Sequence, residues 1–138
     1  MPERTLVIIK PDAVMKGVVE KIKERYVAQG LRIVEERHTK LTESQARNLY
    51  KTHEGRPFFE GLILSMISGP SVALIIEGED AVQTVRFMNG ATDPAKAEPG
   101  TIRHDFRSAG GPFNTVHGSD SQISAEMEIR AVMSVHNS

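Results

Sequence analysis

The amino-acid sequence predicts one domain, residues 1–138, with an α+β fold in the ferredoxin-like order βαββαβ. This order builds a four-stranded antiparallel sheet covered by helices on one face, and the chain adds an inserted helical pair and a C-terminal helix. Two observations support the prediction. Continuous apolar runs at residues 5–9 and 72–76 are typical of strands buried at the centre of a sheet. Other segments carry apolar residues at helical spacing, and the length suffices for one core but not for two.

The first part of the chain supplies two strands and a helix. The strand at residues 5–9 ends at Pro11, because proline has no backbone N–H to donate to a neighbouring strand. Lys10 is therefore left at the carboxyl end of a strand, where ligands often bind. Residues 18–29 carry an apolar stripe that predicts a helix, and residues 31–41 are typical of a second, partly exposed strand.

The inserted helical pair is indicated by two start signals. Residues 42–45 (Thr-Glu-Ser-Gln) form a capping-box pattern, and the helix that follows contains Tyr50, a residue that would also suit a core. The second helix starts at residues 56–59 (Arg-Pro-Phe-Phe). Neighbours on a helix diverge by about 100°, so Phe58 and Phe59 cannot easily share one face. An exposed aromatic ring at this place would be a platform on which a nucleotide base stacks.

The second half of the chain closes the sheet. A buried strand at residues 72–76 is followed by Asp80, a candidate helix cap, and by a helical stripe that ends at Gly90. After a long loop, residues 114–121 (Asn-Thr-Val-His-Gly-Ser-Asp-Ser) lead into a last helix, because apolar residues then recur at four-residue spacing. His117 is therefore expected where a strand or loop turns into a helix.

The composition excludes several classes of function. Seventeen lysines and arginines stand against eighteen aspartates and glutamates, so nucleic acid is not an expected partner. The chain has no cysteine, which excludes thiol catalysis and a disulfide framework. It shows no signal-peptide core and no apolar run of membrane-spanning length, so we expect a cytoplasmic protein without a membrane partner. None of the five histidines has the paired spacing of a zinc site, so we expect no metal held by the protein itself.

The histidine segment contains residue types that suit nucleophilic catalysis. A neutral imidazole is a good nucleophile near pH 7, since its unperturbed pKa is about 6.5. Gly118 permits a close approach of the backbone to a ligand or a positive φ, and Ser119, Asp120 and Ser121 offer oxygens that orient the ring or cap the helix. Taken alone, a single histidine is more often structural than catalytic. The chain also lacks both glycine-rich phosphate-binding motifs, so a nucleotide bound here would have its phosphates held by side chains.

Several specific motifs occur in a fixed order, and together they decide between these interpretations. They are residues 10–12 (Lys-Pro-Asp), 56–59, 68–70 (Ser-Gly-Pro), 90–94 (Gly-Ala-Thr-Asp-Pro), 99–103 (Pro-Gly-Thr-Ile-Arg) and the histidine segment. With these motifs, residues 3–129 resemble the nucleoside diphosphate kinases. The resemblance implies a phosphotransferase that moves the γ-phosphoryl group of a nucleoside triphosphate to a nucleoside diphosphate, in a ping-pong mechanism through a phosphohistidine at His117. It also implies the ferredoxin-like fold with the same helical insertion.

The resemblance also assigns roles to individual residues. Glu128, with Ser119 bonded to it, would hold Nε2 of His117 and leave Nδ1 for the phosphoryl group. Phe58 would stack on the base, and the resemblance also places Tyr50 among the catalytic residues. The residues implied for the phosphates and the ribose are Lys10, Arg86, Thr92, Arg103 and Asn114, with Lys10 also in the catalytic group.

Partners and cofactor follow from the same resemblance. Mg²⁺ would be bound through the nucleotide phosphates, and the chain would form a homo-oligomer, either a tetramer or a hexamer. The chain departs from the family in two places, since Pro112 and Phe113 precede Asn114 and the usual C-terminal aromatic residues are missing. These departures leave the chemistry intact and concern the subunit contacts. The alternative function is a nucleotide-binding regulatory protein of the same fold without significant turnover.

Overall fold

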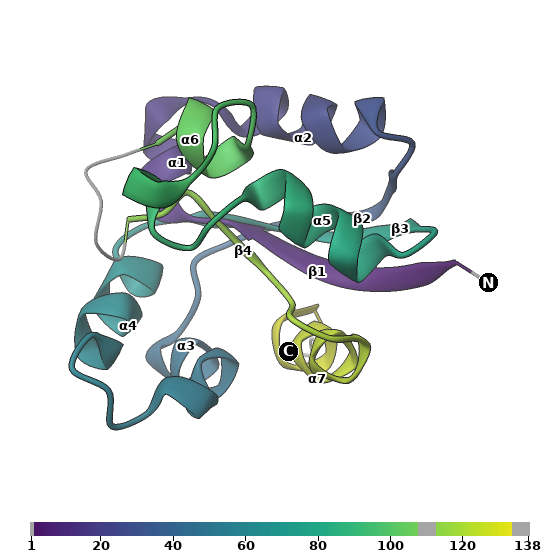
Figure 1. Cartoon of the computed structure of the whole chain (residues 1–138). Helices are drawn as coiled ribbons and strands as arrows, with labels where there is room; N and C mark the ends of the chain where they lie inside the picture. The colour runs from purple at the N-terminus through teal and green to yellow at the C-terminus, as the bar shows by residue number, and fades with distance from the viewer. Residues whose placement is uncertain (1, 108–112, 134–138) are drawn as a thin grey trace.

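The computed structural model describes residues 2–107 and 113–133, which form one four-stranded antiparallel sheet with helices packed on it. The strands lie in the order β2-β3-β1-β4, and each neighbouring pair is antiparallel. This is the predicted ferredoxin-like arrangement, with β1 and β3 in the interior of the sheet (Figure 1). The strands are β1 (Glu3–Ile9), β2 (Arg32–Thr39), β3 (Ser71–Gly78) and β4 (Val116–Gly118).

Helices cover both faces of the sheet (Figure 1). One face carries α1 (Pro11–Lys16), α2 (Val19–Ala28), α5 (Ala81–Asn89) and α6 (Ile102–Asp105). The other carries the inserted pair α3 (Glu43–Leu49) and α4 (Phe59–Ile67), together with α7 (Gln122–Met133). Short 3₁₀ turns follow α3 and α5, namely η1 (Lys51–His53) and η2 (Pro94–Lys96). The helices α2 and α5 of the βαββαβ order therefore share one face as predicted, and the inserted and C-terminal helices close the other.

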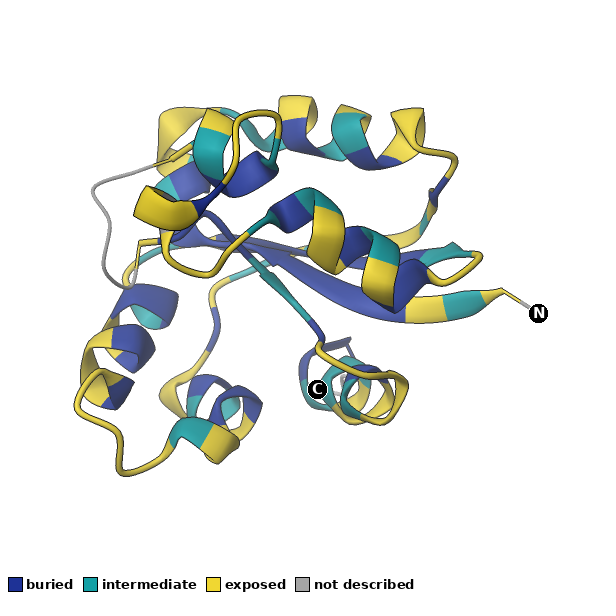
Figure 2. Cartoon of the chain, viewed as in Figure 1, coloured by how far each residue is buried: buried dark blue, intermediate teal, exposed yellow. Residues whose placement is uncertain are grey.

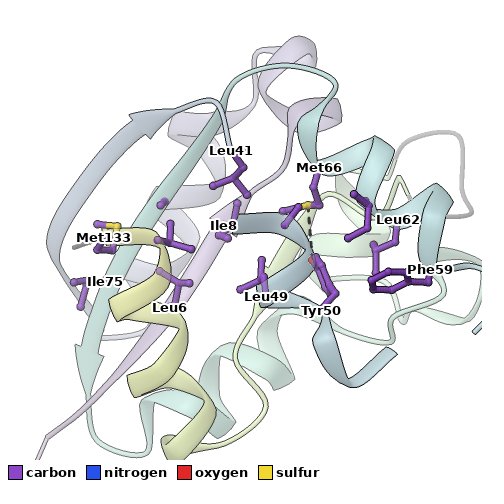
Figure 3. Packing of buried hydrophobic residues seen from close by; sticks show 14 residues of the cluster. Leu6, Ile8, Leu41, Leu49, Tyr50, Phe59, Leu62, Met66, Ile75 and Met133 are labelled. Carbon is purple, nitrogen blue, oxygen red and sulfur yellow. Dashed lines mark hydrogen bonds between the residues drawn. The ribbon is translucent and has the colours of Figure 1, made fainter. Parts of the chain in front are cut away.

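Figure 2 colours most of β1 as buried, and the alternating side chains of this strand divide the core into two layers. Val7 and Ile9 pack with α1, α2 and α5, whereas Leu6 and Ile8 pack with α3, α4 and α7. All four side chains are fully buried. Figure 3 shows the second layer, to which Tyr50 also belongs. A strand covered on both faces needs apolar residues at every position, which explains the continuous run that the sequence shows.

Of two helix caps predicted from the sequence, one forms and the other does not. The capping box at Thr42 forms as predicted, since Thr42 Oγ1 accepts the N–H of Gln45 at 3.0 Å and Gln45 Oε1 accepts the N–H of Thr42 at 2.9 Å. The prediction that the Asp80 side chain caps α5 is wrong. Asp80 precedes the helix with a φ of 48° and makes no capping hydrogen bond, and Glu3 Oε1 instead accepts the N–H of Val82 at 3.2 Å.

Two short helices were not predicted. Helix α1 begins at Pro11 itself, because proline suits the first turn of a helix as well as it ends a strand. Helix α6 begins after Thr101, whose Oγ1 accepts the N–H of His104 at 3.3 Å. Most of the polar loop before Phe113, and the polar tail after Met133, lie outside the described residues. Within the described ranges, no helix combines the length and the apolar character needed to span a membrane.

Candidate active site

A cavity of about 660 Å³ brings the predicted site residues together. Its walls come from α3, η1 and the start of α4, from α5 and the segments after it, and from β4 and α7. Eight of the predicted residues line it, namely Tyr50, Phe58, Arg86, Thr92, Arg103, Asn114, His117 and Glu128. Lys10 and Ser119 are buried beside it and contact Asn114 and Glu128. Residues from distant parts of the sequence therefore meet in one place.

His117 is the middle residue of β4, where it pairs with Ile8 of β1. Its Nε2 lies 2.8 Å from Oε1 of Glu128 on α7, and Ser119 Oγ donates to the same oxygen at 2.7 Å. A carboxylate only accepts hydrogen bonds, so Nε2 carries the ring proton and Nδ1 keeps its lone pair. The contact implied by the resemblance is present, and Nδ1 is the nitrogen left for nucleophilic attack.

Tyr50 shapes this site through its ring. The ring packs edge-on against His117, with the centroids 5.3 Å apart and the planes at 84°. The hydroxyl oxygen lies 3.7 Å from Sδ of Met66 inside the core (Figure 3). Burial raises the pKa of this hydroxyl, which keeps it protonated. Tyr50 therefore contacts the imidazole through its ring, and its polar atom is turned toward the core.

Lys10 lies at the carboxyl end of β1, as predicted, and only 1 % of its surface is exposed. Its Nζ donates to Oδ1 of Asn114 at 2.8 Å. Burial lowers the pKa of this amine to about 8, while the carboxylate of Asp12 raises it and Arg103 lowers it further. Because burial disfavours an ammonium group, an anion that approached Lys10 would stabilise its charged form.

Arg103 is anchored to backbone carbonyls around the histidine strand. Its Nε donates to Asn114 O at 3.2 Å, Nη1 to Gly90 O at 2.7 Å and Nη2 to Val116 O at 2.8 Å. Burial lowers the pKa of the guanidinium, yet arginine stays charged in proteins. Each terminal nitrogen carries a second N–H group, so the anchored side chain still has donors for a ligand in the cavity.

The exposed residues that line the cavity include Phe58, Arg86 and Thr92. Phe58 is 50 % exposed and Phe59 only 3 %, which confirms that the two rings do not share a face and that Phe58 is the exposed one. The Nδ2 of Asn114 donates to Thr92 O at 3.2 Å. This bond ties the loop after α5 to the segment before β4.

Gly118 is needed for a reason that the sequence did not indicate. It has no positive φ. A Cβ at this position would lie 2.8 Å from Nδ2 of Asn89 and 3.3 Å from Cγ1 of Val85, both on α5. Asn89 is itself held, since its Oδ1 accepts from the Tyr26 hydroxyl at 2.6 Å. Glycine therefore lets the histidine strand pack closely on α5.

The sequence motifs assigned no role to His53 and Asp12, which lie at or beside the site. His53 lines the cavity between Tyr50 and Phe58, with ring centroids 6.1 and 5.5 Å from theirs. Its position three residues after Tyr50 held a signal, because helical spacing places such residues on one face. Asp12 accepts the N–H of Thr115 at 3.1 Å across a separation of 103 residues. No spacing rule links residues so far apart.

Comparison with known proteins places the chain in a family. Residues 3–137 match the family model described as nucleoside diphosphate kinase. The chain belongs to the nucleoside diphosphate kinase family. It is 51 % identical over 127 residues to the nucleoside diphosphate kinase of Campylobacter jejuni subsp. jejuni serotype O:2, a match that covers 92 % of each chain. The enzyme of the same name from Wolinella succinogenes is 50 % identical over the same length, with the same coverage.

Solved structures of the family have the same fold. The Aquifex aeolicus nucleoside diphosphate kinase matches with a TM-score of 0.91 and 41 % identity, over 97 % of this chain and 96 % of that one. A Halobacterium salinarum nucleoside diphosphate kinase in complex with CDP also matches with a TM-score of 0.91, at 40 % identity over 96 % and 88 % of the two chains. The family and the fold expected from the motifs are confirmed, and the chain is a member of a family of phosphotransferases.

Proposed function

We propose that this chain moves the γ-phosphoryl group of a nucleoside triphosphate to a nucleoside diphosphate through a phosphohistidine at His117. The contact of His117 Nε2 with Glu128 carries the proposal, because it leaves the other ring nitrogen unprotonated beside a cavity lined by two arginines. Relatives named as nucleoside diphosphate kinases support the activity, and a structural neighbour in complex with CDP supports the substrate class.

The reaction has two halves that mirror each other. Nδ1 of His117 attacks the γ-phosphorus, an N–P bond forms, the bond to the β,γ-bridging oxygen breaks, and the nucleoside diphosphate leaves. The ring then carries a positive charge, which the carboxylate of Glu128 stabilises. In the second half, a terminal oxygen of another diphosphate attacks the same phosphorus and breaks the N–P bond. One site serves both halves because donor and acceptor bind alike.

Cationic side chains offset the negative charge on the phosphoryl group during its transfer. Lys10, Arg86 and Arg103 supply this charge from three separate elements of the fold. Anchoring by backbone carbonyls means that the Arg103 guanidinium needs little rearrangement as charge develops, which is the condition for strong electrostatic stabilisation. Asn114 and Thr92 complete the polar lining of the cavity.

Mg²⁺ fits this site as an ion that arrives with the nucleotide. The ion prefers oxygen ligands and is usually bound through one or two carboxylates plus substrate phosphates. Two exposed carboxylates, Asp93 and Asp120, line the cavity and would hold it there. In the parts of the chain that the structure describes, no group of three or more histidine, aspartate or glutamate side chains could bind a metal by itself. When bound, the ion would neutralise phosphate charge.

Phe58→Ala is expected to weaken nucleotide binding by about 1–3 kcal/mol, the usual range for a lost stacking contact with a base. ADP and GDP should lose affinity alike, because a stacked ring contacts the face of a base and not its edges. Since half of the Phe58 side chain is exposed, the melting temperature should change little. Calorimetric titration with both nucleotides, beside thermal melting, measures this. Unchanged affinity with a large drop in melting temperature would instead make Phe58 a core residue.

Nucleotide affinity is expected to fall as the pH rises through about 8, the pKa of buried Lys10. Lys10 is charged below this pH and neutral above it, while bound phosphates favour the charged form and raise its pKa in the complex. Affinity therefore declines from about pH 8 upward, and calorimetry with ADP at pH 7 and pH 9 measures the decline. The phosphate oxygens themselves titrate near pH 6, outside this window. Lys10→Met should flatten the profile, and a parent profile that is already flat would contradict the role of Lys10.

The function is tested by mixing the protein with γ-labelled ATP and then adding GDP. The label should become bound to the protein, remain bound in alkali and be lost in acid, as for a phosphohistidine. GDP should remove it as labelled GTP. A protein that binds nucleotides and never takes the label would be the regulatory protein of the same fold, the alternative that the sequence left open.

A further inference from the structure

The backbone just before β4 makes a strained turn at Thr115. Thr115 has a φ of 74°, and the N–H of Val116 donates to Asn114 O at 2.8 Å. A positive φ with a hydrogen bond between the first and third residues defines the rare and strained form of the γ-turn. For a β-branched residue this conformation is an outlier, and it persists only where surrounding contacts impose it.

Asp12 supplies one of those contacts. Thr115 is fully buried, and its N–H donates to Oδ2 of Asp12 at 3.1 Å. Its carbonyl accepts the backbone N–H of Lys10 at 2.9 Å, and its hydroxyl donates to Phe106 O at 3.1 Å. Of these three contacts, only the one with Asp12 comes from a charged side chain. Asp12 is itself placed in the first turn of α1 by Pro11, which precedes it.

The groups that would meet the phosphates are attached to both ends of this turn. Asn114 on one side accepts from Lys10 Nζ with its side chain and from Arg103 Nε with its carbonyl. Val116 on the other side accepts from Arg103 Nη2 and begins the strand that carries His117. A turn that relaxed to an ordinary conformation would therefore move the anchors of two cations.

We propose that Asp12 is a positioning residue of the phosphate site. Its carboxylate holds the strained turn at Thr115, and through this turn it fixes Lys10, Asn114 and Arg103 around the phosphates. The inference rests on the proposed function, since it concerns how the nucleotide phosphates are bound. It predicts a specific effect on nucleotide binding, which a general role in stability would not produce.

The test is a double-mutant cycle with Asp12→Ala and Thr115→Gly, measured as the Kd for ADP by calorimetry. Glycine adopts a positive φ without steric strain, so the turn needs less support in the Thr115→Gly background. Asp12→Ala is expected to weaken ADP binding by at least about tenfold when Thr115 is present, and by about threefold or less in the Thr115→Gly background. Equal losses in both backgrounds would overturn the proposal.

Two further variants separate geometry from charge and from stability. Asp12→Asn keeps an oxygen that accepts the N–H of Thr115, so at a pH well below about 8, where Lys10 is charged, it should bind ADP within about threefold of the parent. Glu24→Ala removes an exposed carboxylate on α2, away from the cavity, and controls for the change in net charge. Thermal melting accompanies each titration. A lower melting temperature for Asp12→Ala with parental ADP affinity would show a purely structural role and overturn the proposal.

The outcomes also distinguish this inference from the proposed function. If Asp12→Ala does not fold, Asp12→Asn is compared with Asp12→Glu, which keeps the charge and displaces the acceptor oxygen by one methylene group. Parental ADP affinity for Asp12→Asn together with a tenfold loss for Asp12→Glu supports the inference. A tenfold loss for Asp12→Asn, or parental affinity for both variants, overturns it. A parent protein that neither binds ADP nor takes the label overturns the function, and the inference with it. A parent that does both, while Asp12→Ala matches it, overturns the role of Asp12 alone.

Discussion

Replacing His117 with alanine is expected to abolish labelling of the protein by γ-labelled ATP and to slow phosphoryl transfer from ATP to GDP by at least about a thousandfold. The variant lacks the nitrogen that forms the covalent intermediate, and the remaining cations can only bind the nucleotide. ADP affinity should stay measurable, because Lys10, Arg103 and Phe58 are unchanged. Autoradiography of the protein and a coupled assay of GTP formation measure the two effects.

His53→Ala is the matched control, because it removes a second imidazole from the same cavity. The ring of His53 lies against Tyr50 and Phe58, and its removal should leave the protein able to take the label. A label that persists on His117→Ala and disappears from His53→Ala would move the nucleophile from β4 to η1. Labelling of both variants at the parental rate would contradict a covalent step at either histidine.

Local signals in the sequence predicted elements that depend on neighbouring residues. The capping box at Thr42 needs only four residues of chain and forms as expected. The prediction that Asp80 caps α5 is wrong, because Glu3 of β1 supplies the acceptor at the start of this helix. Helix α6 has only four residues, too few for a periodic pattern to reveal it. The central strands of the sheet were predictable because two continuous apolar runs, at residues 5–9 and 72–76, mark them.

The candidate site was predictable in its residues and less so in its geometry. Motif matches selected the side chains, but spacing could not show that the Tyr50 hydroxyl turns toward Met66 or that Gly118 packs against Asn89. Both facts depend on contacts between different elements of the fold. The contact of Asp12 was missed because its partner, Thr115, is 103 residues away in the sequence.

Expectations about other molecules stay predictions. The homo-oligomer, tetramer or hexamer, the cytoplasmic location and the lack of a nucleic-acid partner all concern surfaces that meet something outside this chain. The structure shows which large apolar side chains are exposed, and Phe87 at 84 % and Met15 at 79 % are examples. It does not indicate what covers them. Phe113, one of the departures from the family, is 38 % exposed, while Pro112 lies outside the described residues.

Glu128→Ala is expected to slow phosphorylation of His117 by at least about tenfold, equal to about 1.4 kcal/mol in the barrier. The carboxylate fixes the proton on Nε2 at 2.8 Å and stabilises the positive ring that forms when phosphorus joins Nδ1. Without it, the imidazole can rotate and can carry its proton on the attacking nitrogen. ADP affinity should change little, because Glu128 contacts the histidine and not the proposed phosphate-binding residues. Rapid-quench labelling gives the rate, and calorimetry gives the affinity.

Ser119→Ala separates the two bonds that converge on Glu128. It removes the hydroxyl that donates to Oε1 and leaves the contact between Glu128 and His117 in place. Its effect on the rate should therefore be clearly smaller than that of Glu128→Ala, with ADP affinity again preserved. Glu128→Gln keeps an acceptor oxygen and loses the charge, so it should fall between alanine and the parent if both tautomer and charge matter. A Glu128→Ala protein that folds, binds ADP normally and becomes phosphorylated at the parental rate would exclude the positioning role. That result would leave Glu128 as an ordinary solvated residue of the helix.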